Sequence, residues 1–171
     1  MSSKERVRVD PVELAMETFT KIRNEIGDNE ELGSKLRARA REGPELIRSL
    51  GLIPVLSFYY AKARDALLGG GGEEEKAYLL YFKAILLYLE RLGLVKGVSD
   101  VFDLQSKLQN ASGASSERKE LEKKLRNEIH ERVINILQDL INRSFIASRL
   151  LTPYLIEFKR LCEAVWERER R

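Results

Sequence analysis

The chain has 171 residues, of which 43% are hydrophobic and 33% are charged, and its net charge is +3. This length suits one domain with a substantial core, and the balance of apolar and charged residues excludes wholesale disorder. No apolar run is long enough to cross a membrane, and no signal-peptide core follows the polar N-terminus. We expect a single helical domain over residues 1–171, with residues 1–9 as a disordered tail.

Cysteine and histidine are too scarce for the common disulfide and zinc sites. The sequence holds one of each, Cys162 and His130. An intramolecular disulfide needs two cysteines, so the natural setting is a reducing cytoplasm. A zinc site of the usual type cannot be built within one chain. We interpret Cys162 as a core residue and His130 as a structural residue, and we predict no metal, no cofactor and no catalytic residue.

The first two predicted helices carry clear start and stop signals. Asp10 can cap a helix over residues 11–26, and Gly27 ends it. Its predicted inward residues are Val12, Ala15, Phe19, Ile22 and Ile26. A second helix is expected over residues 30–42, with Gly43 and Pro44 interrupting it before a short turn to residue 50. Its predicted inward residues are Leu32, Leu36 and Ala40.

A run of basic residues occupies the second helix and the turn after it. The basic members are Lys35, Arg37, Arg39, Arg41 and Arg48, against Glu42 and Glu45. Arg37 and Arg41 lie four residues apart, on one face of the helix, and Arg48 can join them after the turn. Arginine forks suit phosphate oxygens and bind them without reading sequence. The alternative is a solvated arginine face paired with the two glutamates.

A third helix is predicted over residues 54–68, after Gly51 closes the preceding segment and with Pro54 in the first turn. Its predicted inward residues are Val55, Leu56, Tyr59 and Ala63. Lys62 lies beside Tyr59 and Tyr60, which could stack on bases. The favoured interpretation places both tyrosine rings in the core with their hydroxyls at its rim.

Four glycines at residues 69–72 predict a flexible loop before the most apolar helix, over residues 73–92. Its predicted inward residues, Leu79, Leu80, Phe82, Ile85, Leu86 and Leu89, cover more than one face, which indicates a central helix. Three glutamates at residues 73–75 would lie at the N-terminus of this helix, where negative charge interacts favourably with the helix dipole. The glycines are not a phosphate loop, because no Gly-Lys-Ser or Gly-Lys-Thr follows and the glutamates would repel phosphate.

The C-terminal half is helical as well. Ser99 can cap a helix over residues 99–109, and residues 110–116 are expected to form a flexible loop. A long helix over residues 117–141 follows, with a break at residues 142–148. Its predicted inward residues are Leu121, Leu125, Ile129, Val133, Ile136, Leu140 and Ile141. The last helix, over residues 149–169, has Pro153 in its first turn or at a kink, and its predicted inward residues are Leu155, Phe158, Leu161, Cys162 and Val165. The predicted fold is all-α, a compact bundle of about six helices.

Two strings resemble one known family. Residues 51–62 read GLIPVLSFYYAK and residues 154–164 read YLIEFKRLCEA. Both are similar to segments of the small subunit of type III-B CRISPR RNA-silencing (Cmr) complexes. Phe158 stands where that family commonly has Trp, Leu161 where it has Phe, and Cys162 where it has Ala, which are tolerable changes in a core helix. The small subunits of type III-A and type I-A complexes are close competitors.

The resemblance implies a non-catalytic subunit that stacks in several copies beside the backbone subunits of a multi-subunit complex. The backbone subunits carry the guide RNA and cut the target RNA, and both RNA strands lie in the groove between the two filaments. The predicted RNA-facing residues are Lys62, Lys159 and Arg160 from the matched strings, and Arg37, Arg41 and Arg48 from charge clustering alone.

Two other functions stay open at this stage. The arginine face could bind an acidic protein partner, which would make the chain a helical scaffold without nucleic acid. A carboxylate cluster could bind a divalent ion and form a small enzyme, although the lack of histidine among possible ligands argues against it.

Overall fold

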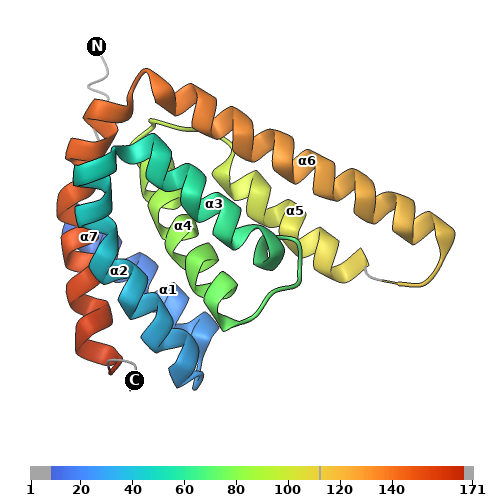
Figure 1. Cartoon of the computed structure of the whole chain (residues 1–171), viewed down its shortest axis with the longest axis horizontal. Helices are drawn as coiled ribbons and strands as arrows, with labels where there is room; N and C mark the ends of the chain where they lie inside the picture. Colours follow the sequence, from blue (N-terminus) through green and yellow to red (C-terminus); the bar gives the residue numbers. More distant parts are fainter. Residues whose placement is uncertain (1–8, 112, 168–171) are drawn as a thin grey trace, which may run out of the picture.

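The computed structural model describes residues 9–111 and 113–167, and these residues form seven helices and no strand. The helices are α1 (Pro11–Ile26), α2 (Glu30–Leu50), α3 (Leu52–Leu67), α4 (Glu73–Arg91), α5 (Val98–Ala111), α6 (Ser116–Ile141) and α7 (Ser144–Val165). The all-α prediction is confirmed, with seven helices in place of about six (Figure 1).

Helix α4 is the centre of the structure. Eleven of its 19 residues are buried, including all six that the sequence predicted to face inward. Helices α2 and α3 pack most extensively against it, and α1, α5 and α7 also contact it. In Figure 1, α4 runs between α2 and α5, behind α3. A helix that is apolar on most of its surface is stable in water only when neighbours enclose it, which explains this position.

Helices α5 and α6 pack against each other and extend away from the other helices, at the right of Figure 1. Only five of the 26 residues of α6 are buried: Leu125, Ile129, Val133, Ile136 and Leu140. Leu121 was predicted to face inward but is exposed, because no helix besides α5 accompanies the first turns of α6. The start of α5 is capped by Glu90 of α4, which accepts hydrogen bonds from the Val98 amide and the Ser99 hydroxyl, both at 2.9 Å.

The predicted interruption at Gly43 and Pro44 is wrong, because α2 continues through both residues to Leu50. Pro44 has no N–H to donate to the Ala40 carbonyl, so one backbone hydrogen bond is missing. Ala40, Gly43 and Ile47 are all buried, so packing holds the helix on both sides of the proline. A Cβ atom at Gly43 would lie 2.0 Å from the Tyr81 hydroxyl oxygen. Glycine serves here to admit a side chain of α4, not to end a helix.

Other predicted boundaries also move. The break between α6 and α7 consists of two residues, since α6 ends at Ile141 and α7 begins at Ser144. Pro153 therefore lies inside α7. The connection between α5 and α6 is shorter than the predicted 110–116. Val12, Ile141 and Val165 were predicted to face inward but are 42%, 53% and 39% exposed, and Leu161 is only partly buried.

Replacing Gly43 with Ala is expected to lower the free energy of unfolding by about 1–3 kcal/mol, the usual cost of overpacking a core. The new methyl group would overlap the buried Tyr81 ring, and this cost exceeds the gain in helix propensity. Urea unfolding of the variant measures the change. Gly70→Ala is the matched control, because its Cβ would meet only the Asp65 carbonyl oxygen, at 3.5 Å. Equal stability of the two variants would contradict the proposed role of Gly43.

Candidate nucleic-acid interface

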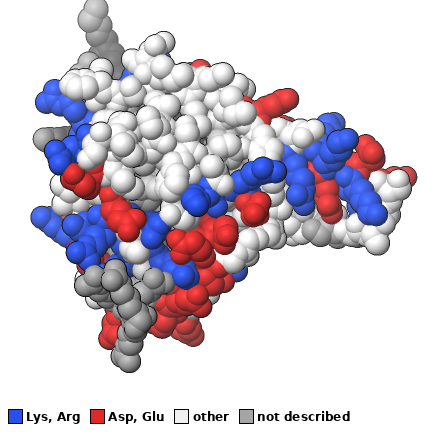
Figure 2. All heavy atoms as spheres, viewed as in Figure 1, with Lys and Arg blue, Asp and Glu red and all other residues white. Residues whose placement is uncertain are grey.

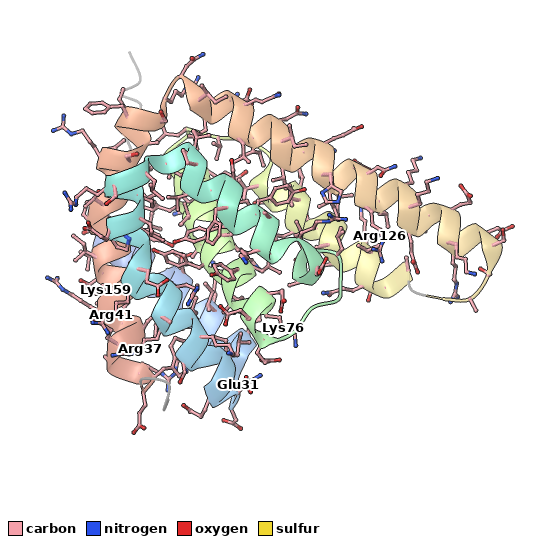
Figure 3. All side chains as sticks on the ribbon, viewed as in Figure 1. Glu31, Arg37, Arg41, Lys76, Arg126 and Lys159 are labelled. Atoms are coloured by element: carbon pink, nitrogen blue, oxygen red, sulfur yellow. The ribbon has the colours of Figure 1, made fainter. Side chains whose placement is uncertain are left out.

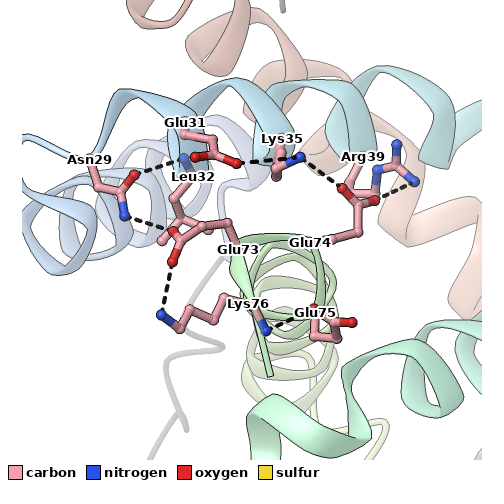
Figure 4. Close-up of polar contacts among 10 residues, drawn as sticks. Asn29, Glu31, Leu32, Lys35, Arg39, Glu73, Glu74, Glu75 and Lys76 are labelled. Carbon is pink, nitrogen blue, oxygen red and sulfur yellow. Dashed lines mark hydrogen bonds and ion pairs between the residues drawn. The ribbon is translucent and has the colours of Figure 1, made fainter. Parts of the chain in front are cut away.

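The basic run of α2 divides between two faces of the helix. Lys35 and Arg39 face α4, where the Glu74 carboxylate lies 3.4 Å from the Lys35 Nζ and 3.5 Å from the Arg39 Nη1 (Figure 4). The Arg39 guanidinium also lies 4.7 Å from the centre of the Tyr78 ring and donates a hydrogen bond to the Tyr78 hydroxyl. These two cations hold α2 and α4 together.

The other two glutamates at the start of α4 also have local partners. Glu73 accepts hydrogen bonds from Asn29 at 2.7 Å and from Lys76 at 2.9 Å, and the bond from Lys76 is the main reason why the pKa of Glu73 is lowered. Glu75 accepts a hydrogen bond from the Gly72 amide at 2.9 Å, which completes a cap on the helix. All three glutamates therefore stabilise this end of α4 and its contact with α2.

Arg37 and Arg41 lie on the opposite side of α2, along the seam with α7. Figure 3 shows them beside Lys159 of α7. Within the described residues, neither Arg41 nor Lys159 forms an ion pair. Arg37 is partly buried, and its Nε has no hydrogen-bond partner among those residues. Two cations from different helices are thus left without a protein anion.

A groove of about 650 Å³ lies between the second half of α2 and α7. Four cations and one carboxylate line it: Arg41, Arg48, Arg149, Lys159 and Glu45. Its other lining residues include Phe145 and Ile156 of α7. In Figure 2, Lys and Arg side chains gather over α2 and α7 at the left, with some Asp and Glu among them. The excess of positive charge suits an anionic ligand.

Arg48 is partly neutralised within the groove. Its Nε and Nη2 donate to the two carboxylate oxygens of Glu45 at 3.0 and 2.6 Å. These hydrogen bonds, followed by one from Ser49, lower the pKa of Glu45. The alternative of a paired arginine face is therefore correct for Arg48, whereas Arg41 has no such partner.

The remaining predicted residues are not part of the groove. Arg160 follows Lys159 on α7, is exposed and lies 3.4 Å from Glu157. Lys62 lies on α3 with its Nζ 5.7 Å from the centre of the Phe58 ring. The structure thus brings Arg41, Arg48 and Lys159 together, with Arg37 beside them on α2, and separates Lys62 from this group.

The rings of the tyrosines beside Lys62 pack on the core, as the favoured interpretation held, but the Tyr59 hydroxyl is buried and does not lie at the rim. Tyr59 is buried between Tyr78 and Tyr81, with ring centroids 5.9 and 5.5 Å away. Tyr60 stacks on Phe82 at 6.0 Å, and its hydroxyl forms a hydrogen bond with the His130 Nδ1. Neither ring is free to receive a base.

Sequence reasoning missed Phe145 and Arg149, which both line the groove. The predicted break over residues 142–148 contained Phe145 and placed Arg149 at the very start of the last helix, so their common face was not recognised. Had a continuous helix been drawn from Ser144, the spacing of residues 145, 149, 152, 156 and 159 would have placed all five on one face.

Few groups in the structure are arranged for metal or acid–base chemistry. Residues 9–111 and 113–167 contain no cluster of three or more His, Cys, Asp and Glu residues that could hold a metal ion. No helix within these ranges has both the length and the apolar character needed to span a bilayer. The lone thiol, Cys162, is buried, and burial raises its pKa.

Comparison with known proteins gives one family and a matching fold. Residues 12–149 match the family described as CRISPR-associated protein (Cas_Cmr5). A chain of the type III-B Cmr-beta complex bound to non-cognate target RNA, solved by cryo-EM, has a TM-score of 0.67 and 24% identity, with 95% of this chain and 100% of that chain covered. A chain of the Cmr-beta complex bound to cognate target RNA and AMPPnP has a TM-score of 0.62 and 26% identity, with 93% and 97% covered. No curated protein sequence matches.

Arg39 and Arg41 form a matched pair for separating stability from binding. Arg39→Gln is expected to lower the free energy of unfolding by about 1–3 kcal/mol, because Tyr78 loses its charged partner and Glu74 keeps only Lys35 among the described residues. Arg41→Gln removes the same charge from an exposed site and should change stability by less than about 0.5 kcal/mol. Thermal unfolding at one pH measures both. Equal losses of stability in the two variants would show that Arg39 does not hold α2 against α4.

The His130 pKa is expected to lie below its usual value of about 6.5. Burial is the main cause, and the nearby positive charges of Arg64 and Arg126 add to it. Because the folded state binds the proton less readily than the unfolded chain, stability should fall as the pH drops below about 6.5. NMR titration gives the pKa directly. His130→Gln should remove this part of the pH dependence of stability. If stability depends on pH in the same way in the variant, His130 is not its source.

Proposed function

Because the chain belongs to the CRISPR-associated Cas_Cmr5 family, we propose that it is the non-catalytic small subunit of a type III-B Cmr ribonucleoprotein in antiviral defence. Several copies stack beside the backbone subunits, along the channel between the two filaments of the complex that holds the guide and target RNA. The observation that supports an RNA contact is the groove between α2 and α7, in which four cations face one carboxylate.

The chemistry of this groove favours the phosphate backbone as its ligand. Arg41 and Lys159 have no ion pair within the described part of the chain, so phosphate oxygens can bind them without displacing a carboxylate. Contacts of this kind position a nucleic acid but carry no sequence information. A complex that must accept any target needs such contacts, because base pairing between guide and target supplies the specificity.

The described side chains favour a binding role over a catalytic one. The His130 ring is tied to Tyr60, and the Cys162 thiol is buried at raised pKa. A thiol needs an adjacent base or a lowered pKa to react as a nucleophile, whereas the pKa of the Cys162 thiol is raised. Cutting of target RNA then belongs to other subunits. The lone free cysteine favours a reducing cytoplasm as the place of action.

Charge reversal in the groove tests the RNA contact. Arg41→Glu and Lys159→Glu, in the assembled complex, are expected to weaken RNA binding about equally for unrelated sequences. Each lost contact should reduce the slope of log affinity against log salt by up to about 0.7 for single strands. Binding titrations at several salt concentrations measure both effects.

The matched control is Lys107→Glu, which makes the same charge change at an exposed site on α5, outside the groove. Unchanged affinity and slope for both groove variants would remove the groove from the RNA contact. Partners that stay bound to the wild-type protein after RNase treatment, while the groove variants lose them, would indicate the helical scaffold instead.

A further inference from the structure

Phe145 is unusually exposed for its position beside a basic groove. Its side chain is 72% exposed, the highest value among the large apolar side chains of the described residues. It lies in the first turn of α7, and the Arg149 guanidinium lies 5.9 Å from the centre of its ring. Both residues line the groove between α2 and α7. An exposed aromatic ring is costly to keep in water, so a ligand that covers it would gain affinity.

The groove has the size and chemistry for a short segment of single-stranded nucleic acid. Its volume of about 650 Å³ lies within the usual range of small-molecule sites, about 300–1,000 Å³. Phe145 and Ile156 offer apolar surface, whereas Arg41 and Lys159 offer positive charge. Proteins that bind single-stranded nucleic acid combine these two elements, a basic channel for phosphates and an aromatic ring for a base.

We propose that Phe145 is a stacking platform for an unpaired nucleobase whose own phosphate binds Arg149, while Arg41 and Lys159, farther along the groove, bind the phosphates of neighbouring nucleotides. This inference rests on the proposed contact between the groove and RNA. It adds that the RNA is unpaired where it binds. A base inside a duplex has both faces covered by its neighbours and cannot stack on Phe145. The groove therefore takes a single-stranded segment or a nucleotide turned out of the guide–target duplex.

The charges around Phe145 favour a nucleotide over an apolar protein surface. Besides Phe145, the groove is lined by three cations without ion pairs in the described residues, Arg41, Arg149 and Lys159. An apolar partner would bury these charges without compensation, which is unfavourable. The exposed Ile146 and Leu150 are not among the lining residues, so they do not add to the apolar surface that Phe145 and Ile156 offer inside the groove.

Photocrosslinking in the assembled complex tests the proposal. Guide and target RNAs carry 5-iodouridine at successive positions, because this base crosslinks efficiently to aromatic rings on which it stacks. The complex is prepared with the wild-type chain, with Phe145→Leu and with Phe58→Leu. Phe58 is the control, since it is an exposed aromatic residue that lies on α3 outside the groove.

We expect a crosslink to Phe145 at particular RNA positions, lost in Phe145→Leu and retained in Phe58→Leu. Phe145→Leu should weaken RNA binding about 5- to 10-fold, within the range measured for base–aromatic stacking, and leave the salt slope unchanged.

Three results would overturn the inference. If no position crosslinks to Phe145 while the charge reversals of Arg41 and Lys159 weaken binding, the stacking role fails and the proposed function stands. If no position crosslinks to Phe145 and the charge reversals leave RNA binding unchanged, both the stacking role and the proposed RNA contact fail. If Phe145→Leu keeps the chain out of the complex, a protein subunit covers the ring.

Discussion

The enclosure of α4 is the constraint from which the other features follow. A helix with eleven buried residues out of 19 can exist in water only if several other helices surround it. Burying a leucine or phenylalanine stabilises the fold by about 1.5–3 kcal/mol relative to exposure, so this requirement outweighs local preferences of the chain. Helix α2 illustrates the result. It continues through Pro44, at the loss of one hydrogen bond, because its buried residues on both sides of the proline help to close the core around α4.

The same constraint sorts the charges of α2. Once one face of α2 packs on α4, every residue of the basic run has a fixed direction. Lys35 and Arg39 point toward Glu74, and their charges hold the two helices together. Arg37 and Arg41, offset by two residues, point toward α7, and Arg41 forms no ion pair within the described residues. A single cluster in the sequence thus becomes a structural set and a surface set, and only the second can bind a ligand.

The sequence was sufficient for the features that depend on local patterns. The apolar character of residues 73–92 predicted the central helix, and Asp10 predicted the start of α1, where its carboxylate accepts from the Val12 amide at 2.8 Å. It failed where packing overrides a local signal, as at Gly43, which admits Tyr81. The candidate site was predictable only in part, since Arg41 and Lys159 were identified but their meeting across two helices was not. Lys62 is basic and exposed like Arg41, but it lies on α3 outside the groove. No pattern in the sequence distinguishes Lys62 from Arg41.

The spacing of the groove cations is set by the core at both ends of α2. Near its start, Gly33 lies against Trp166, which follows α7, and a Cβ at Gly33 would lie 2.2 Å from the indole ring. Trp166 is buried and packs on Phe19 at 5.3 Å, which fixes the end of α7 to α1 and α2. Because these contacts are close-packed, α2 and α7 cannot slide past each other without breaking them. The backbone positions of Arg41 and Lys159 are therefore fixed before any ligand arrives, so binding phosphate orders two side chains but moves neither helix.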